Sequence, residues 1–392
     1  MKNKLKVIAY TVGRSDFERF LPILNILKGK KNVKLEIVPS YIHYLSFFGS
    51  TIQNIKKKFS VVSSPNYKNT SFNLQDNPKY LASMVSSEIK KISDIFKKKR
   101  PDLIFILGDR FEMISAPIAA LPFNIPVIHL YGGAITEGAI DDSIRHSITK
   151  LSHFHLVAHS EYKKRINQLG EENWRIVNIG IPEINLMKKQ KKMSKYEISK
   201  ITGLDFSKKT MLVTFHPVTK EPKLIKKHVK ILSNVLKKTN MQAILTYPNS
   251  DSGFKEIVRE YKFLNQKLKN ITIIKNAGLK LYTNLMMHCS LMLGNSSSGI
   301  VEATSFKLPV INIGNRQEGK VKPDNVIDCK FNELSINQAL NFALSKKFNR
   351  KISNIKNPYD KKINLTKVLN QVFKLSKKKT FLNKKFYDHF RR

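Results

Sequence analysis

The amino-acid sequence predicts an α/β protein made of two Rossmann-like domains with a cleft between them. Short runs rich in Ile, Val and Leu recur along the chain with amphipathic helical stretches between them, as in parallel sheets that are buried on both faces. The length of 392 residues exceeds one ordinary domain and allows two with substantial cores. Hydrophobic residues make up 41% of the chain and charged residues 25%, which is the balance of a globular protein.

In the first half of the chain, apolar runs predict strands that alternate with helices. Helices are expected at residues 78–98 and 141–151, where apolar side chains recur at helical spacing. Strands are expected at residues 5–10, 33–38, 103–107, 127–130, 154–157 and 176–179.

The strand pattern stops in a polar, Lys-rich passage at residues 189–193 and restarts at residues 211–215. We place the domain boundary here and expect one domain over residues 1–185 and a second over residues 186–362. Residues 363–392 are expected to form an amphipathic helix, at 364–375, and a basic, partly frayed tail. Further strands of the second domain are expected at residues 243–246, 271–274, 291–293 and 310–313.

The net charge of +41 would suit a nucleic-acid-binding protein, because Lys and Arg neutralise phosphates. Most of the excess is Lys, however, and it is spread over the whole length of the chain. No zinc finger, RNP-type aromatic strand or basic zipper accompanies the charge. A solvated basic surface is therefore the favoured interpretation.

Two further features bear on the cellular compartment. No segment approaches the roughly 18 apolar residues of a membrane-spanning helix, and the apolar stretch at residues 7–10 is too short for a signal-peptide core. Cys289 and Cys329 are the only cysteines, so neither a disulfide framework nor a structural zinc site is expected. We expect a cytoplasmic protein that does not bind membranes.

Ligands of open α/β sheets bind beyond the carboxyl ends of the strands, and the strongest signal there is the loop at residues 294–302. Its small residues let a ligand approach the backbone, and the hydroxyls and free N–H groups at the start of the next helix form a seat for a diphosphate. Glu302 is expected on the first turn of that helix, where its carboxylate can accept hydrogen bonds from both ribose hydroxyls. The alternative is an ordinary Ser N-cap beside a Gly-rich turn. The predicted seat comprises Asn295, Ser296, Ser297, Ser298 and Gly299.

Two strand-end loops of the first half carry charged residues. Arg14 and Asp16 follow the first strand, and a guanidinium there can grip phosphate oxygens in two places. The alternative is a turn with an exposed Arg. Asp109 and Arg110 follow the strand at 103–107, where Asp109 can move a proton or hold a group that does. The alternative for Asp109 is a helix N-cap beside a surface ion pair.

A loop with three glycines at residues 129–142 precedes a helix that carries Arg145. The glycines permit a tight backbone, and the loop's acids, among them Glu137 and Asp141, can face a sugar. For one of the two acids Asp141 and Asp142, a plain N-cap is the expected role.

The second half supplies further strand-end residues. His216 follows the strand at 211–215, so it is expected to point into the same cleft and to donate to a phosphate or act as a general acid. The alternative is a core histidine with satisfied hydrogen bonds. Asn249 and Asp251 follow the next strand, and Arg316 is expected to contact phosphate or uracil.

Read together, these loops resemble the UDP-N-acetylglucosamine 2-epimerase family, specifically its hydrolysing branch, which supplies sialic-acid and legionaminic-acid pathways. The resemblance runs from about residue 6 to residue 328. The most specific motifs lie at residues 108–110, 140–153, 215–217, 294–299 and 313–317.

The resemblance implies a glycosyltransferase-B-like fold with the nucleotide held mainly by the C-terminal domain and the sugar facing the N-terminal one. Neither a cofactor nor a metal is implied, and a homodimer would suit the family. Asp109 and an acid of the loop at 137–142 would face the sugar. UDP would be held by Arg14, His216, Asn249, Ser297, Ser298, Glu302 and Arg316.

One departure from the family concerns the glycine loop. Members usually carry a Glu just before or just after the glycine pair, whereas this chain has Tyr131 and Ala134 there. Either Glu137 or Asp141 takes the place of that carboxylate, or the sugar substituents differ.

The implied reaction removes the proton from carbon two while UDP leaves carbon one, and then adds water to the unsaturated sugar. The product is a free N-acetylmannosamine-type sugar. Both UDP-N-acetylglucosamine and a UDP-diacetamido-trideoxyhexose stay open as substrates. A UDP-sugar glycosyltransferase and a nucleic-acid-binding protein are the alternative functions, and the non-hydrolysing branch is disfavoured because its Glu-rich loop is missing.

Overall fold

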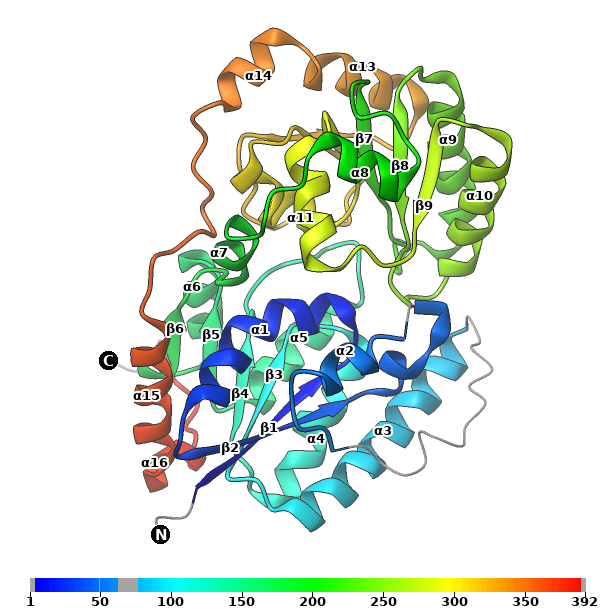
Figure 1. Cartoon of the computed structure of the whole chain (residues 1–392). Helices are drawn as coiled ribbons and strands as arrows, with labels where there is room; N and C mark the ends of the chain where they lie inside the picture. Colours follow the sequence, from blue (N-terminus) through cyan, green and yellow to red (C-terminus); the bar gives the residue numbers. More distant parts are fainter. Residues whose placement is uncertain (1–3, 49, 63–76, 389–392) are drawn as a thin grey trace. The chain divides into compact units, whose positions relative to one another are not determined.

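The computed structural model describes residues 4–48, 50–62 and 77–388. The chain forms two compact units, which we call unit 1 and unit 2 (Figure 1). Unit 1 comprises Met1–Ala134, Ile140–Glu183 and Lys361–Arg392, and unit 2 comprises Ile135–Ala139 and Ile184–Asp360. Among the described residues, no helix combines the length and the apolar character needed to cross a membrane.

Unit 1 is built on a parallel sheet of six strands in the order β2-β1-β3-β4-β5-β6. The runs in its middle are apolar throughout because both faces of a parallel sheet are covered by helices, and every residue of β3, β4 and β5 is buried. The six strands predicted for the first half are confirmed, three of them at the predicted bounds. The strands are β1 Leu5–Thr11, β2 Val33–Pro39, β3 Leu103–Leu107, β4 Val127–Leu130, β5 Phe154–Val157 and β6 Ile176–Asn178.

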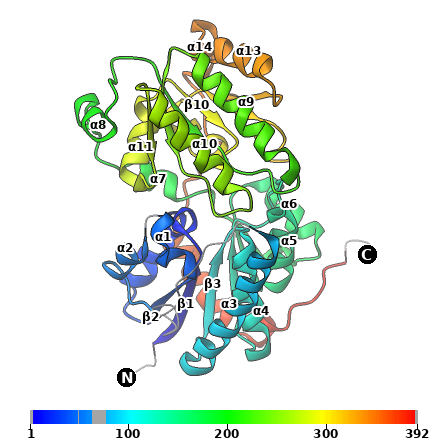
Figure 2. The ribbon, with the colours of Figure 1, turned by 90° about the vertical axis from the view of Figure 1, so that its right-hand side faces the viewer.

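The helices of unit 1 cover both faces of this sheet. α3, Pro78–Lys99, shows why they form: Asn77 caps its start by accepting the Tyr80 N–H at 2.8 Å, and a buried stripe that includes Ile92 and Phe96 packs on the strands. Figure 2 shows α3 beside α4. The other helices are α1 Arg14–Gly29, α2 Ile52–Lys56, α4 Ser115–Ala120, α5 Asp141–Leu151, α6 Ser160–Gln168, α15 Leu365–Ser376 and α16 Lys379–Leu382, with 3-10 turns η1 Tyr41–Tyr44, η2 Ser46–Phe48, η4 Phe111–Ile114, η5 Leu121–Phe123 and η6 Asn173–Arg175.

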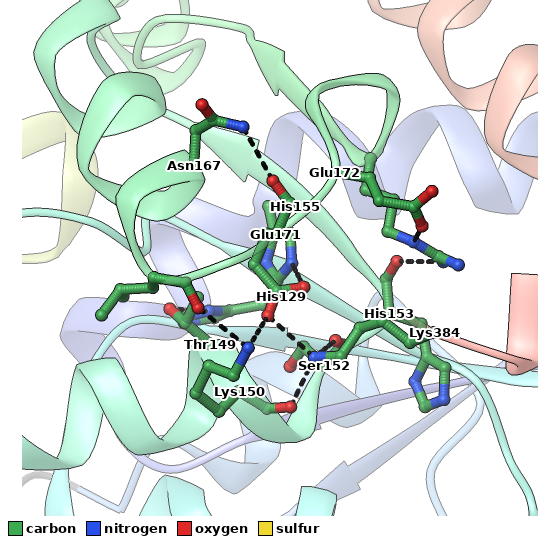
Figure 3. A network of polar contacts seen from close by, with 12 residues as sticks. His129, Thr149, Lys150, Ser152, His153, His155, Asn167, Glu171, Glu172 and Lys384 are labelled. Carbon is green, nitrogen blue, oxygen red and sulfur yellow. Dashed lines mark hydrogen bonds and ion pairs between the residues drawn. The ribbon is translucent and has the colours of Figure 1, made fainter. Parts of the chain in front are cut away.

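The segment that follows α15 packs on unit 1, so the prediction of a partly frayed tail is wrong for the residues up to 388. Arg175 donates to the main-chain carbonyls of Thr380 and Phe381 at 2.8 and 2.9 Å, and the Phe381 ring is fully buried. Lys384 reaches the buried Glu171, with 3.0 Å between Nζ and Oε1 (Figure 3). Local lysine content suggested a solvated end, whereas these contacts come from residues about 200 positions away. Residues 389–392 lie outside the described residues.

Unit 2 repeats the architecture with a parallel sheet in the order β12-β11-β10-β7-β8-β9. All strands predicted for the second half are present, but β12 was missed. It is an edge strand with no fully buried residue, and Asp328 interrupts its apolar pattern. Asn312 on the neighbouring strand donates to Asp328 Oδ1 at 2.7 Å. The strands are β7 Thr210–Thr214, β8 Gln242–Thr246, β9 Ile271–Ile274, β10 Leu291–Gly294, β11 Val310–Ile313 and β12 Val326–Cys329.

The helices of unit 2 also lie on both faces of its sheet, with α9 and α10 side by side (Figure 2). α7, Glu183–Lys188, begins at the last residue of unit 1. The others are α8 Lys195–Thr202, α9 Ile225–Lys238, α10 Phe254–Lys267, α11 Gly278–His288, α12 Ser297–Val301, α13 Glu333–Ala343 and α14 Lys346–Ile352, with 3-10 turns η7 Pro222–Leu224 and η8 Ala303–Phe306.

Candidate active site

The loop after β10 in unit 2 has the close-packed backbone that the sequence indicated. Gly294 has a φ of +142°, and a Cβ there would overlap the Thr214 carbonyl oxygen. A Cβ on Gly299 would lie 2.7 Å from Val310. Ser296 is the N-cap of α12, and its Oγ accepts the Ser298 N–H at 3.3 Å. The remaining N–H groups at this helix start are what an anion would use.

Glu302 does not lie on the first turn of α12, contrary to the prediction. The helix ends at Val301, and Glu302 is the C-cap, with its N–H donating to the Ser298 carbonyl at 3.0 Å. The chain continues directly after α12 into the 3-10 turn η8. Glu302 is 5% exposed, so its carboxylate lies inside unit 2 at the end of α12.

The loops after β7 and β10 are locked together by one carboxamide. Asn295 Oδ1 accepts the His216 N–H at 2.8 Å, and Asn295 Nδ2 donates to the His216 carbonyl at 2.9 Å. The Asn249 N–H, from the loop after β8, donates to His216 Nδ1 at 3.1 Å. Because Nδ1 accepts, the neutral ring carries its proton on Nε2 and can donate from there. His216 is thus both a buried histidine with a satisfied Nδ1 and a possible hydrogen-bond donor.

Arg316, from the loop after β11, joins the same cluster. Its Nη1 donates to the Asn295 carbonyl at 3.2 Å, and its Nη2 lies 3.9 Å from Asp251 Oδ2. The Gln317 side chain donates to the same Asn295 carbonyl at 2.8 Å. Arg316 is only 7% exposed, and its Nε has no hydrogen-bond partner among the described residues. The loops after β7 and β11 therefore both bond to Asn295 in the loop after β10, and the loop after β8 joins them through His216 and Arg316.

Glu137 belongs to a segment that packs on this cluster. Residues 135–139 group with unit 2, and a Cβ on Gly138 would lie 2.8 Å from the Arg316 Cα. The Glu137 N–H approaches the Glu318 carbonyl at 3.5 Å, and its side chain is exposed.

In unit 1, Asp109 is held by Arg145, a residue that the predicted site did not include. Arg145 Nε donates to Asp109 Oδ2 at 3.0 Å, and Nη2 forms an ion pair with the same oxygen. Arg145 Nη1 donates to the Ala134 carbonyl at 2.8 Å and to Asp142 Oδ1 at 3.1 Å. The guanidinium is 1% exposed, whereas the Asp109 side chain is 32% exposed. One buried cation therefore fixes an accessible carboxylate.

The N-cap roles that the sequence suggested for Asp109 and for one of Asp141 and Asp142 are wrong. The N-cap of α5 is Ile140. Asp141 and Asp142 occupy the first turn, where the positive end of the helix dipole stabilises negative charge. Asp109 caps no helix, because the 3-10 turn after it starts beyond Arg110. The sequence did contain a signal for Arg145, because it follows Asp142 by three residues and Asp141 by four on the same helix, a spacing that places these side chains next to one another.

His129 fixes the backbone beneath Asp109. Its Nε2 lies 2.9 Å from the Gly108 carbonyl, and burial lowers the pKa of the ring to about 3. The ring is therefore neutral at physiological pH and donates from Nε2 to that carbonyl.

Asp16 and Arg110, for which substrate contacts were predicted, both have partners within unit 1. Asp16 is buried, and its oxygens accept from the Val12 and Gly13 N–H groups at 2.8 and 2.6 Å. The carboxylate thus holds the turn that presents Arg14. Arg110 forms an ion pair with the buried Glu112 at 3.1 Å.

Comparisons of the whole chain show its relatives. The family model described as UDP-N-acetylglucosamine 2-epimerase matches residues 25–372. The chain is 36% identical over 390 residues to a GDP/UDP-N,N'-diacetylbacillosamine 2-epimerase (hydrolyzing) of Campylobacter jejuni, covering 98% of this chain and 100% of that protein. It is 33% identical over 350 residues to a UDP-N,N'-diacetylbacillosamine 2-epimerase (hydrolyzing) of Legionella pneumophila, covering 87% and 89%.

Solved structures show the same fold. The crystal structure of UDP-GlcNAc 2-epimerase from Neisseria meningitidis bound to UDP-GlcNAc matches with a TM-score of 0.75 at 17% identity, covering 95% of this chain and 100% of that one. The UDP complex of MnaA from S. aureus matches with a TM-score of 0.76 at 16% identity, covering 95% and 96%. These matches confirm the predicted glycosyltransferase-B-like α/β fold. Together with the family match, they show that the chain belongs to the UDP-N-acetylglucosamine 2-epimerase family.

Proposed function

We propose that this protein is a hydrolysing 2-epimerase that acts on UDP-N,N'-diacetylbacillosamine, releasing UDP and the free 2-epimeric sugar. The observation that carries the proposal is that Asn295, in the loop after β10, bonds to the loops after β7 and β11 and so gathers the donors of His216, Arg316 and the α12 start at one sheet edge. Such a set suits a diphosphate. The choice of sugar is supported by the Campylobacter and Legionella relatives, whose names both specify a diacetylbacillosamine.

On the nucleotide side, each residue has a distinct proposed role. The departing diphosphate gains negative charge, which the Nε2 proton of His216, the guanidinium of Arg316 and the N–H groups of α12 would stabilise without rearrangement. Glu302 would accept from the ribose. Arg14, Asn249, Ser297 and Ser298 complete the proposed UDP contacts.

On the sugar side, Asp109 is the acid/base group that the structure supports best. Arg145 orients its carboxylate while leaving the group accessible, as proton transfer to or from a ligand requires. Epimerisation at carbon two needs a second such group, since the proton leaves one face and returns on the other. Glu137 and Asp141 stay candidates. A cytoplasmic location and a homodimer also stay predictions.

The proposal is tested by incubating the purified protein with UDP-N,N'-diacetylbacillosamine and, separately, with UDP-N-acetylglucosamine, without an acceptor. Proton NMR should show UDP and a free 2-epimeric sugar, formed faster from the diacetamido substrate. An inverted sugar that keeps its UDP would contradict hydrolysis. A UDP-sugar that is consumed only after an acceptor is added would favour the glycosyltransferase alternative.

A further inference from the structure

Tyr131 and Glu183 form a buried hydroxyl–carboxylate pair at the carboxyl edge of the unit 1 sheet. The Tyr131 hydroxyl donates to Glu183 Oε2 at 2.8 Å, and Glu183 Oε1 lies 3.5 Å from Arg19 Nε. Glu183 is 2% exposed and Tyr131 is 9% exposed. The hydroxyl and the guanidinium, which come from the end of β4 and from α1, both stabilise an ionised carboxylate. The carboxylate is thus held in its ionised form, and the Tyr131 hydroxyl is the group through which a proton can reach it.

Tyr131 leaves the sheet beside Asp109. Their strands β3 and β4 are parallel neighbours, with Leu107 opposite Leu130, and the Gly108 N–H donates to the Leu130 carbonyl at 2.9 Å. Neighbouring strands lie about 4.8 Å apart. The residues that follow these strands therefore start from adjacent points of the same edge.

The backbone at Tyr131 is held in an unusual conformation. Its φ is +65°, in the left-handed region that bulky residues rarely adopt, and its N–H donates to the Leu156 carbonyl at 2.8 Å. Residues held in this way concentrate at functional sites, because the surrounding structure must enforce them. The conformation fixes the direction in which the phenol leaves the strand.

Two carboxylates of unit 1 are consequently associated with adjacent strand ends. Asp109 is held by Arg145, and Glu183 is held by Arg19 and reached through Tyr131. Glu137, by contrast, belongs to the segment that groups with unit 2.

We propose that the Tyr131–Glu183 pair is the second acid/base group of the epimerisation, the one that removes the proton from carbon two. This inference rests on the function proposed above. In the elimination, the C2–H bond breaks and its proton passes to the Tyr131 oxygen, while the Tyr131 hydroxyl proton passes to Glu183. The C2–H electron pair forms the C1=C2 double bond, and the electron pair of the C1–O bond leaves with UDP. Glu183 ends protonated and later loses that proton to solvent.

Asp109 then serves the hydration on the opposite face. Its carboxylate takes a proton from the attacking water as the water oxygen bonds to carbon one, and it passes that proton to carbon two. The double-bond electron pair forms the new C2–H bond. Asp109 begins and ends this step as a carboxylate, the form that its ion pair with Arg145 favours. Removal from one face and return on the other inverts carbon two.

The test separates the two half-reactions. Glu183→Gln and Tyr131→Phe are assayed for UDP release from the UDP-sugar and for hydration of the corresponding free 1,2-unsaturated sugar. Both variants should lose about 100-fold in UDP release, the scale of a lost acid/base group, while hydration stays within a few-fold of the wild type. Asp109→Asn should lose hydration. Tyr10→Phe is the matched control, because it deletes another buried Tyr–Glu hydrogen bond of 2.8 Å in unit 1, to Glu88, and should leave both half-reactions intact.

A double variant tests the carboxylate directly. Tyr131→Glu combined with Glu183→Gln moves the carboxylate to the strand end and should recover at least tenfold of the UDP release that Glu183→Gln loses. UDP release by Glu183→Gln within tenfold of the wild type would overturn the inference, as would an equal loss of both half-reactions, which marks a structural role. Failure of the wild type itself to release UDP and free sugar would instead reject the proposed function.

Discussion

Lys384→Met is expected to destabilise unit 1 by removing a partly buried cation from the C-terminal segment. The Lys384 ammonium donates to the main-chain carbonyls of Lys150 and Ser152 at 2.5 and 2.9 Å and lies 3.0 Å from Glu171 (Figure 3). Its side chain is 17% exposed, and that of Glu171 is fully buried. Methionine keeps most of the aliphatic stem, so the change isolates the charge and its hydrogen bonds.

The magnitude follows from what the variant leaves behind. Removing one partner of a buried ion pair lowers the free energy of unfolding by about 3–5 kcal/mol when the other charge is left without a partner. Glu171 keeps two partners in the variant, because Lys150 Nζ lies 2.7 Å from its Oε1 and His155 Nε2 lies 3.2 Å from its Oε2. The main-chain carbonyls of Lys150 and Ser152 each lose a hydrogen-bond donor, at about 1 kcal/mol each, and Glu171 loses one of its three side-chain partners at a similar cost. We therefore expect the free energy of unfolding to fall by about 3 kcal/mol.

Trp174, the single tryptophan of the chain, reports on this region directly. Its ring centroid lies 6.4 Å from that of Phe381, and the Arg175 guanidinium lies 4.2 Å from the Trp174 ring centroid. Guanidinium unfolding followed by tryptophan fluorescence should shift to lower denaturant in Lys384→Met, while Lys385→Met, at the exposed next residue, should match the wild type. A loss below about 1 kcal/mol, or equal losses in both variants, would refute the reasoning.

Four other changes have defined outcomes. Burial raises the Glu171 pKa, but the contacts with His155 and the nearby lysines together outweigh it and lower the pKa from 4.5 to about 2. About 3 kcal/mol of stability, present above pH 4.5, should therefore be lost as the pH falls toward 2 in acid-unfolding curves. Asp109→Asn should cut overall turnover about 100-fold with UDP affinity unchanged by calorimetry. Ser297→Ala with Glu302→Ala should weaken UDP binding at least tenfold, and equal affinity would reject the nucleotide site. Gly294→Ala should lower thermal stability, since its Cβ would overlap a main-chain carbonyl and its φ is positive.

Strands were predictable from the sequence where all of their residues are buried, because burial on both faces requires an apolar side chain at every position. β3, β4 and β5 lie inside a sheet covered on both faces, so their sequences are unbroken apolar runs with recognisable ends. β12 was missed because an edge strand needs only partial burial and tolerates Asp328. The docked C-terminal segment was missed because Phe381 gains its burial from residues far away in the chain.

The candidate site was predictable in its loops but not in its pairings. Because ligand-binding residues follow parallel strands, the strand-end rule led to the loops that carry Asp109, His216 and Arg316. Whether a charged group in such a loop faces a ligand or the protein depends on tertiary contacts. Asp16 therefore could not be recognised from the sequence as a group that holds its own turn. The spacing of Arg145 on its helix indicated a pair with Asp142, but not its contact with Asp109, which lies 36 residues away.

The distribution of arginine carries information that the net charge hides. Only twelve of the 70 basic residues are arginine. Lysine suits a solvated surface, whereas a planar guanidinium can satisfy several acceptors at once in a buried place. Arg145 binds two carboxylates and a carbonyl, Arg175 binds a carboxylate and three carbonyls, and Arg316 joins a carbonyl to an acid. Exposed arginines such as Arg259 also occur, so these multiple contacts belong to the buried arginines and not to the residue type as a whole. Arg19 resembles this buried group in its partner, because its guanidinium lies 3.5 Å from the buried Glu183 carboxylate.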